Sequence, residues 1–537
     1  MNSAAIAKDM GTPASHWRVS ENAGILPETP AKPVKSEDFA IASDDVTSIA
    51  GIFFRAITLY PKRPALVAGG RTWSYEELGR AVLAAASGIR ELVPAGGGRI
   101  AIVGGNHPAY ILAYWGAQCA GCSTVEADGN ESLQTLLGVL GATRPRFLVT
   151  DRSDLILAVQ GNIPVCSFEK FCGKSDNAPE MPVLPEAPIK DSSIEASIVY
   201  TSGTTSSAKG VVLSQGNFCF IARAVADYMG LNETDRCALI LPLCHTYGKS
   251  VLLGAAAAGA AIVILDGFGN QRRFLSRLTT EGCTVLCAVP YHLNTLVKSG
   301  CLPRLKFSPL RIIASSADKL PPAVIDSLTE ALPEVRIFSM YGLTEAATRV
   351  CYVPPEMIHA KKESCGRPLP RVELKIVTED GRAAAAYETG EIILRGPNVM
   401  TGYLGDPDLT AETIVDGWLK TGDIGHLDAD GFLYIDGRKK DLIKCAGERI
   451  SPSEIEEILM EYPEVEGAAA VGRPDSLMGE VIHAYVASRN PLLKKADLRE
   501  HCRARLPHNK VPYGYTIVER LPVTGTGKIK KFSLGKR

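Results

Sequence analysis

Short runs rich in Val, Ile and Leu alternate with longer helix-like stretches along most of this chain. Such runs are typical of buried strands when turn-forming residues and helical patterns separate them. Strands that alternate with helices predict parallel sheets covered by helices, which is an α/β fold. We expect strands in the following runs: 99–105, 146–151, 261–265, 284–290, 311–316 and 336–342.

The pattern also divides the chain into parts of unequal size. Residues 1–45 are polar and aperiodic, and they predict a loosely ordered leader. A boundary is expected near Gly437, because Ser451-Pro452-Ser453-Glu454 then opens a new helix with the signature of a capping box and with Pro at the first helical position. We therefore expect a large N-terminal domain of several subdomains, 46–437, and a small α+β C-terminal domain, 438–537.

Composition excludes several classes of protein. Of 537 residues, 46% are hydrophobic and 22% are charged, which is typical of globular proteins and excludes disordered, collagenous or coiled-coil chains. The net charge of −1 gives no overall positive field for nucleic acid. That neutral total hides an asymmetry, since 438–537 has 19 basic against 13 acidic residues and the rest of the chain has a net negative charge.

Cysteine usage and apolar runs indicate a cytoplasmic protein. The 14 cysteines follow no regular spacing, and the single CxxC, Cys119 and Cys122, lies in an apolar run without the second pair that a zinc site needs. The N-terminus has no apolar segment of the secretory type. The longest apolar run, Val251 to Leu265, is shorter than the roughly 20 residues of a membrane span.

The segment YTSGTTSSAKGV, Tyr200 to Val211, follows a strand-like run and has the composition of a phosphate-binding loop. Backbone amides of small residues can converge on a polyphosphate, hydroxyl groups add donors, and Lys209 adds a positive charge. The spacing excludes a Walker P-loop, in which Lys follows Gly and precedes Ser or Thr, because Lys209 lies between Ala208 and Gly210.

This loop and YGLTE at 341–345 resemble motifs of the adenylate-forming superfamily, which includes acyl- and aryl-CoA synthetases. Further motifs of the superfamily follow in the expected order. They are LPLCHTYG (241–248), GRPLPRVELKI (366–376), GEIILRGPNVMTGYL (390–404), the segment 418–459 that contains KTGDIG and AGERISPSE, VGRPDSLMGE (471–480) and LPVTGTGKIKK (521–531). The resemblance is strong over 195–537 and weaker over 48–190.

The resemblance implies a reaction in two steps. A carboxylate first attacks the α-phosphate of ATP, with Mg²⁺ bound, and releases pyrophosphate from an acyl-adenylate. A thiol, most often that of CoA, then displaces AMP. Preorganised positive charge and orientation favour the meeting of two anions, and orientation alone can contribute roughly 7–11 kcal/mol.

The same resemblance assigns roles to nucleotide-binding residues. Glu345 is expected to bind Mg²⁺, Thr344 the α-phosphate, and Tyr341 with Gly342 the adenine. Asp423 is expected to accept hydrogen bonds from the ribose hydroxyls, with Arg438 near the ribose or phosphate. The pyrophosphate loop is expected to comprise Thr201, Ser202, Gly203, Thr204, Thr205 and Lys209, and the adenine segment Ser316, Ala317 and Asp318, where relatives commonly have Gly-Gly-Ala.

Catalysis is assigned by resemblance to Lys528, whose cation would bridge the carboxylate and the α-phosphate. The small domain would rotate as a lid about a hinge at Lys440 and bring Gly447 to a thiol tunnel. His245 corresponds to a gate of the acyl pocket, and a buried structural histidine is an equal alternative.

The acid-binding pocket is the least specified part of the prediction. Amino-acid-activating relatives usually have Asp at the position of Thr246, so an α-amino acid is disfavoured and an apolar or aryl acid is favoured. Arg349 could pair with a polar group on the acid or with a structural carboxylate. The pocket positions by motif offset are Thr246, Ser250, Cys287, Ala314, Met340, Thr348 and Arg349.

We expect CoA as the acceptor, because the AGERISPSE motif is intact. A carrier protein and an amine, as in secondary-metabolite pathways, are the alternatives. A non-catalytic nucleotide sensor is disfavoured because Lys528 and Glu345 are both present.

Overall fold

The computed structural model describes residues 46–93, 97–172, 191–201, 209–265, 267–522, 529 and 531–534. Residues 1–45, where the sequence predicts a loosely ordered leader, lie outside this set.

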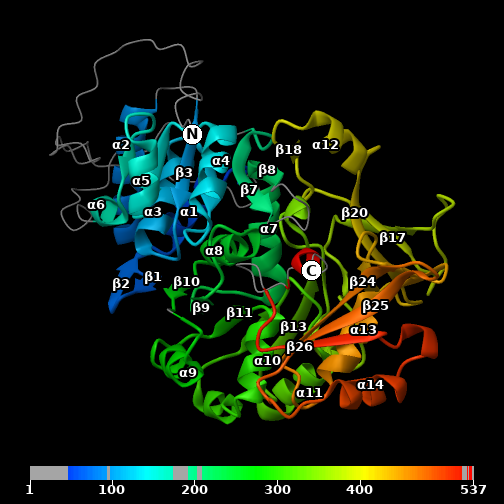
Figure 1. The fold of residues 1–537 in the computed structure, drawn as a ribbon. Helices are drawn as coiled ribbons and strands as arrows, with labels where there is room; N and C mark the ends of the chain where they lie inside the picture. Colours follow the sequence, from blue (N-terminus) through cyan, green and yellow to red (C-terminus); the bar gives the residue numbers. More distant parts are fainter. Residues whose placement is uncertain are drawn as a thin grey trace.

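A nine-stranded sheet forms the lower centre of the molecule (Figure 1), with strand order β15-β14-β13-β12-β11-β9-β10-β1-β2. The strands from β13 to β1 are parallel, and antiparallel strands complete both edges. The bounds are β1 Pro64–Ala68, β2 Arg71–Ser74, β9 Arg236–Leu239, β10 Ala261–Ile264, β11 Val285–Ala288, β12 Ile312–Ser315, β13 Arg336–Tyr341, β14 Cys351–Tyr352 and β15 Arg367–Pro368.

A seven-stranded sheet lies beside it, with strand order β18-β8-β7-β4-β3-β5-β6. The strands from β7 to β6 are parallel, while β8 and β18 are antiparallel. The bounds are β3 Arg99–Val103, β4 Ser123–Ala127, β5 Phe147–Thr150, β6 Val165–Cys166, β7 Glu195–Thr201, β8 Lys209–Ser214 and β18 Gly402–Tyr403.

Helices cover both faces of the two sheets. The largest core contains inward-facing residues of both sheets together with α1, α2, α3, α7 and α8, whereas α4 with α5 and α9 with α10 and α11 pack on the outer faces. The bounds are α1 Ile49–Leu59, α2 Tyr75–Leu92, α3 Pro108–Cys119, α4 Leu133–Thr143, α5 Ser153–Val159, α6 Phe168–Cys172, α7 Gln215–Met229, α8 Thr246–Ala258, α9 Gln271–Thr280, α10 Pro290–Lys298, α11 Pro322–Ala331 and α12 Pro407–Thr413.

The predicted parallel sheets covered by helices are therefore confirmed, and each of the six expected strands is present, as β3, β5, β10, β11, β12 and β13. An antiparallel sheet to their right in Figure 1 was not predicted. Its strands alternate between buried and half-exposed positions, so they lack the apolar runs of the parallel strands. The bounds are β16 Glu373–Val377, β17 Gly390–Arg395, β19 Ile414–Val415, β20 Trp418–Leu427 and β21 Leu433–Arg438.

The C-terminal segment forms a separate sheet with its own apolar core. The predicted helix start is confirmed, because α13 begins at Pro452 with Ser451 as its N-cap. The predicted capping box is wrong: Ser451 Oγ accepts from Ser453 N at 3.3 Å, and Glu454 pairs with Lys510 instead. The bounds are β22 Ile443–Cys445, β23 Glu448–Ile450, α13 Pro452–Met460, β24 Gly467–Asp475, β25 Gly479–Ala487, α14 Lys495–Arg503 and β26 Gly514–Val518.

Two further observations concern the apolar helices and the CxxC pair. Among the described helices, none is long and apolar enough to cross a membrane. Cys119 and Cys122 are both buried free thiols, and burial raises the pKa of Cys119 to about 12 and that of Cys122 to about 11. These two cysteines are thus inert core residues, as the sequence predicts.

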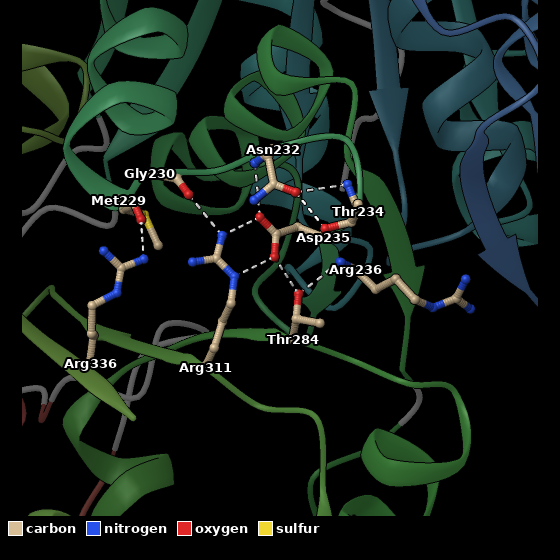
Figure 2. A network of polar contacts seen from close by, with 9 residues as sticks. All are labelled: Met229, Gly230, Asn232, Thr234, Asp235, Arg236, Thr284, Arg311 and Arg336. Carbon is tan, nitrogen blue, oxygen red and sulfur yellow. Dashed lines mark hydrogen bonds and ion pairs between the residues drawn. The ribbon is translucent and has the colours of Figure 1, made fainter. Parts of the chain in front are cut away.

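Figure 2 shows a polar network around Asp235, where β9, β11, β12 and β13 begin. The buried Asp235 carboxylate accepts hydrogen bonds from Arg311 Nε at 2.7 Å, Thr284 Oγ1 at 2.7 Å and Asn232 N at 2.9 Å. Arg336 donates to the Met229 carbonyl at 2.8 Å. These bonds tie the amino ends of the strands together and leave the opposite edge for ligands.

Asp235→Asn should lower the free energy of unfolding by about 2 kcal/mol at neutral pH, because hydrogen bonds to a charged group are lost. Burial alone would raise the pKa of Asp235, but the bonds from Arg311 and Thr284 outweigh it and the pKa is lowered. The carboxylate therefore stabilises the fold above the ordinary Asp pKa, near 4. This contribution is lost as pH falls through the lower folded pKa.

Urea unfolding at neutral pH and at acid pH tests this dependence. The difference between the native chain and Asp235→Asn should shrink at acid pH, and a difference independent of pH would contradict it. Asp326→Asn, at an exposed carboxylate paired with Lys362, is the control.

Candidate functional site

The predicted site residues gather at the carboxyl ends of the parallel strands, opposite the Asp235 network. β12 is followed by Ser316, β13 ends at Tyr341, and β7 ends at Thr201. The edge at which parallel strands end is where α/β proteins bind their ligands.

Lys209 and Glu345 both lie beside one tyrosine. Thr201 and Lys209 are register partners at the ends of β7 and β8, on either side of the predicted phosphate loop. The Lys209 amine lies over the Tyr403 ring, 5.1 Å from its centre, and the Tyr403 hydroxyl donates to Glu345 Oε1 at 3.1 Å. A cation and a carboxylate are therefore held by the same aromatic side chain.

Glu345 is placed by a short 3-10 helix, Thr344–Ala346, that directly follows the β13 edge. Its carbonyl accepts from Met400 N at 2.8 Å, which ties this turn to the strand pair that carries Tyr403. The carboxylate is partly exposed, and its oxygens are hard donors of the kind that Mg²⁺ prefers. Among the described residues, Tyr403 binds only one of the two Glu345 carboxylate oxygens, so the other can take a metal ion. Glu345 therefore fits the predicted Mg²⁺ site.

Three predicted nucleotide-binding residues form one hydrogen-bonded group. Asp423 on β20 is buried, its Oδ2 accepts from the Tyr341 hydroxyl at 2.6 Å, and its Oδ1 pairs with Arg438 Nε at 2.9 Å. Burial and the neighbouring carboxylate raise the pKa of Tyr341, so its hydroxyl stays a donor. Each carboxylate oxygen retains a second lone pair, which leaves Asp423 able to accept from ribose hydroxyls.

The predicted adenine segment, Ser316 to Asp318, has a backbone conformation typical of glycine although it contains no glycine. Ala317 has φ of +83°, a conformation that L-residues rarely adopt and that Gly adopts freely. Ala317 therefore holds this conformation at a cost of roughly 1–2 kcal/mol. Gly342 is required for a different reason, because a Cβ there would lie 1.7 Å from the Thr348 carbonyl oxygen.

The predicted pocket residues converge from one helix and three strands. Thr246 and Ser250 lie on α8, while Cys287, Ala314 and Met340 lie on the adjacent strands β11, β12 and β13. All five are buried.

Thr348 and Arg349 complete this set. Both are buried, and Arg349 NH2 lies 3.1 Å from Ser250 Oγ. The Tyr247 hydroxyl lies between the ends of β11 and β12, where its single proton can be donated to the carbonyl of Ala288 at 3.2 Å or to that of Ala314 at 3.0 Å. The motif offsets thus select residues that are also neighbours in space.

His245 occupies the N-cap of α8 but makes no capping bond with its side chain. Its Nε2 is buried without a hydrogen-bond partner among the described atoms. One nitrogen of its ring lies within 4.8 Å of ligand atoms of Asp128 and Cys244. Burial lowers the pKa of His245, with Asp128 opposing the shift. The imidazole is therefore neutral at pH 7, consistent with either predicted role.

The predicted hinge lies next to the Asp423 group. Burial lowers the pKa of Lys440, and the charges of Arg438 and Lys209 contribute to this shift. Gly447, in the turn between β22 and β23, has φ of +84° with open space where a Cβ would lie. Lys528, Ser202, Gly203, Thr204 and Thr205 lie outside the described residues, so their roles stay predictions.

Polar contacts connect α13 and the loop before β24 to segments that flank the nine-stranded sheet. Lys319, next to Asp318, pairs with Glu457 of α13 at 2.9 Å, and the Lys298 amine donates to the Val465 carbonyl at 2.9 Å. Lys531 pairs with the neighbouring Glu456 at 2.7 Å. Lys531 is thereby held on the same helix that binds Lys319, beside the adenine segment.

Tyr403 and Tyr247 were not predicted from the sequence. Both lie inside matched motifs, GEIILRGPNVMTGYL and LPLCHTYG, which is the signal that could have identified them. Their roles depend on contacts with residues about 58 and 41 positions away, and only the fold shows these.

Comparisons with known proteins agree with this geometry. The model of the AMP-binding enzyme family matches residues 53–404, and that of the AMP-binding enzyme C-terminal domain matches 454–528. An indoleacetate–CoA ligase of Aromatoleum aromaticum is 35% identical over 370 residues, covering 68% of this chain and 70% of that protein. A 2-succinylbenzoate–CoA ligase of Listeria monocytogenes is 30% identical over 487 residues, covering 90% and 98%.

The Bacillus subtilis o-succinylbenzoate CoA synthetase has been solved with its acyl-adenylate intermediate and also with ATP and a magnesium ion. These structures match with TM-scores of 0.81 and 0.80 at 29% identity, over 90% of this chain and 98–99% of theirs. Their large N-terminal and small C-terminal parts correspond to the fold described above. The matches confirm the resemblance seen in the motifs, and this chain belongs to the AMP-binding enzyme family.

Proposed function

We propose that this chain is an AMP-forming ligase that activates an aryl acid with ATP and transfers the acyl group to CoA. The observation that carries the proposal is that two groups of side chains meet at the carboxyl end of β13, where Tyr341 ends the strand and Glu345 follows it. Lys209 and Glu345 meet at Tyr403, and Tyr341 and Arg438 meet at Asp423. The first group suits a metal-bound polyphosphate, and the second suits a ribose.

The family relationship supports the class of reaction. The relatives described above are CoA ligases, and the solved structures of one such enzyme contain ATP with magnesium and an acyl-adenylate. The class of enzyme predicted from the sequence, a carboxylate–CoA ligase, is confirmed by these relatives. Which acid this chain accepts is part of the proposal.

The site residues divide the work of the first step. Lys209 binds pyrophosphate oxygens, Asp423 orients the ribose, and Glu345 holds Mg²⁺. When bound, Mg²⁺ supplies positive charge to the phosphate oxygens. Lys528 brings a cation to the carboxylate and the α-phosphate, where negative charge concentrates in the transition state. Thr344 positions the α-phosphate, so that the acid and the phosphate meet in line.

The second step needs a different arrangement of the two parts. We place the domain boundary at 437/438, directly after Gly437, which pairs with Ile424 of β20. Rotation about Lys440 would remove Lys528 and bring the open Gly447 turn to the adenylate. Gly447 has no side chain, and apart from Gly447 and its two chain neighbours no described atom lies within 4 Å of the position that a Cβ would take, which leaves room for a pantetheine arm.

The acid is proposed to be an aryl acid of low polarity near its carboxylate. Cys287, Ala314 and Met340 are small or apolar, and Thr246 replaces the Asp that would hold an α-amine. Indoleacetate and 2-succinylbenzoate, the acids named for the relatives, both contain an aromatic ring. CoA as acceptor fits a cytoplasmic site of action, which the free buried cysteines also favour.

Pyrophosphate release across a panel of aryl, fatty and amino acids tests the first step. AMP release with CoA, a carrier protein or an amine then tests the acceptor. We expect aryl acids and CoA to be the best pair. No pyrophosphate with any acid would reject the ligase function, whereas AMP release only with a carrier protein or an amine would reject CoA.

Asp423→Ala should raise the KM for ATP by roughly 10- to 100-fold, because a hydrogen-bonding carboxylate on the ribose is lost in both ground and transition states. The turnover number should change less. Steady-state pyrophosphate release at varied ATP measures both constants. Asp430→Ala, at an exposed carboxylate paired with Lys361, is the control, and an unchanged KM for ATP in Asp423→Ala would contradict the ribose role.

A further inference from the structure

Arg349 is a buried cation without a counter-ion among the residues that the structure describes. Its side chain is 1% exposed, and no ion pair joins it to a carboxylate in the part of the chain that the structure describes. Its Nε is buried without any hydrogen-bond partner there. A buried charge without a counter-ion is costly, and burial is normally tolerated when a pair or a hydrogen-bonding anion is present.

The described groups that surround Arg349 are all neutral. NH1 lies 2.9 Å from Met340 Sδ, NH2 lies 3.1 Å from Ser250 Oγ, and the guanidinium lies over the Tyr247 ring, 4.4 Å from its centre. A guanidinium has five N–H donors, whereas a thioether is a weak acceptor and the Ser250 hydroxyl, which itself donates to the Tyr247 carbonyl at 2.7 Å, accepts only part of them. The Arg349 guanidinium therefore retains N–H donors that these neighbours do not use.

The backbone that presents Arg349 is strained. Ala347 and Thr348 have φ of +48° and +78°, and a β-branched residue rarely adopts a positive φ. Strain of this kind persists when the surroundings enforce it, and it is concentrated at functional sites. Asn398 Nδ2 holds the Arg349 carbonyl at 2.8 Å, so the turn is anchored by the backbone rather than by the guanidinium.

We propose that Arg349 selects an acid that carries a second anionic group, a dicarboxylate in which one carboxylate is activated and the other pairs with the guanidinium. The inference rests on the proposed ligase function. Ser250, Met340 and Arg349 are all positions that the motifs assign to the acid pocket, and Arg349 contacts both of the others. A bidentate carboxylate matches the planar fork of Arg and would supply the missing counter-charge.

The test compares aryl dicarboxylates whose side chains have zero to four carbons with their mono-carboxamides, using pyrophosphate release. The amide has nearly the same shape as the carboxylate but no charge. The native chain should prefer the best dicarboxylate over its amide by roughly 100-fold in kcat/KM, because a site built for a charged partner rejects a neutral analogue. Arg349→Met should lose this preference, and Arg349→Lys should keep part of it. Arg336→Gln, at the exposed start of β13, should leave it unchanged.

Thermal unfolding of the same variants gives a second readout that does not require turnover. If the charge is unbalanced in the free protein, Arg349→Met should unfold at the same or a higher temperature than the native chain, and the preferred dicarboxylate should stabilise only the native chain. A clear fall in unfolding temperature for Arg349→Met would show a structural role and overturn the proposal. Equal use of dicarboxylates and amides by the native chain would also overturn it. The absence of pyrophosphate with every acid would instead reject the ligase function itself.

Discussion

Lys528→Ala should reduce pyrophosphate release from acid and ATP by about 100- to 1,000-fold, the size of effect seen when one preorganised donor is removed from a developing charge. The carboxylate and the α-phosphate repel each other, and the lysine cation is the group expected to bridge them. The same variant should largely retain transfer to CoA from a supplied acyl-adenylate, because in the proposed rotation Lys528 has left the site by the second step. Separate assays of the two half-reactions measure this split.

Lys495→Ala provides the matched control, since Lys495 is an exposed lysine at the start of α14 in the same domain. It should leave both half-reactions unchanged. Equal losses in the two half-reactions of Lys528→Ala would contradict the alternation of the two domains.

Lys249→Met should destabilise the fold by about 3–5 kcal/mol, because it removes one partner of a buried ion pair. Lys249 Nζ lies 2.8 Å from Glu126 Oε2, and the two side chains are 1% and 0% exposed. Ser197 Oγ lies 2.6 Å from each of these atoms. Burial lowers the pKa of Lys249 and Glu126 opposes this shift, so the ammonium depends on that carboxylate. Urea unfolding followed by tryptophan fluorescence measures the loss.

The double variant Lys249→Met with Glu126→Gln separates the pair from its surroundings. Without the lysine, the Glu126 carboxylate is buried and uncompensated, so neutralising it should recover much of the lost stability. Lys362→Met, at a lysine paired with Asp326 on the surface, should have little effect. If the double variant were no more stable than Lys249→Met, the cost would come from packing rather than from charge.

The parallel strands could be predicted because they are buried on both faces and read as apolar runs. Ile312 to Ser315, for example, are all buried. The antiparallel sheet could not, since a strand such as β17 alternates buried and partly exposed residues and competes with turns and loops in a single sequence. The residues around Ser451 correctly predict where a helix begins. They wrongly predict that Glu454 completes a capping box, because Glu454 pairs with Lys510 on a distant segment.

The site was predicted residue by residue from ordered motifs, and the structure shows which of these residues touch. One hydrogen-bonded group contains Tyr341, Asp423 and Arg438. It forms because β20 pairs with β21 and because β13 ends beside them. The Lys249–Glu126 ion pair could not be predicted, because nothing in the sequence around either residue indicates a partner more than a hundred residues away. The unbalanced charge of Arg349 is likewise a property of its surroundings, which only the fold defines.

In the proposed rotation, the contacts between the two parts of the chain would affect how quickly the enzyme turns over. Lys319–Glu457 is an ion pair with both side chains partly exposed, and Lys298 binds a single carbonyl in the loop that precedes β24. Exposed pairs of this kind contribute roughly 0–1 kcal/mol each. Water can replace such bonds as they break, so releasing them in the proposed rotation would add only a small barrier. A lid held by an apolar face would instead have to expose that face in every cycle, and its opening would limit the rate.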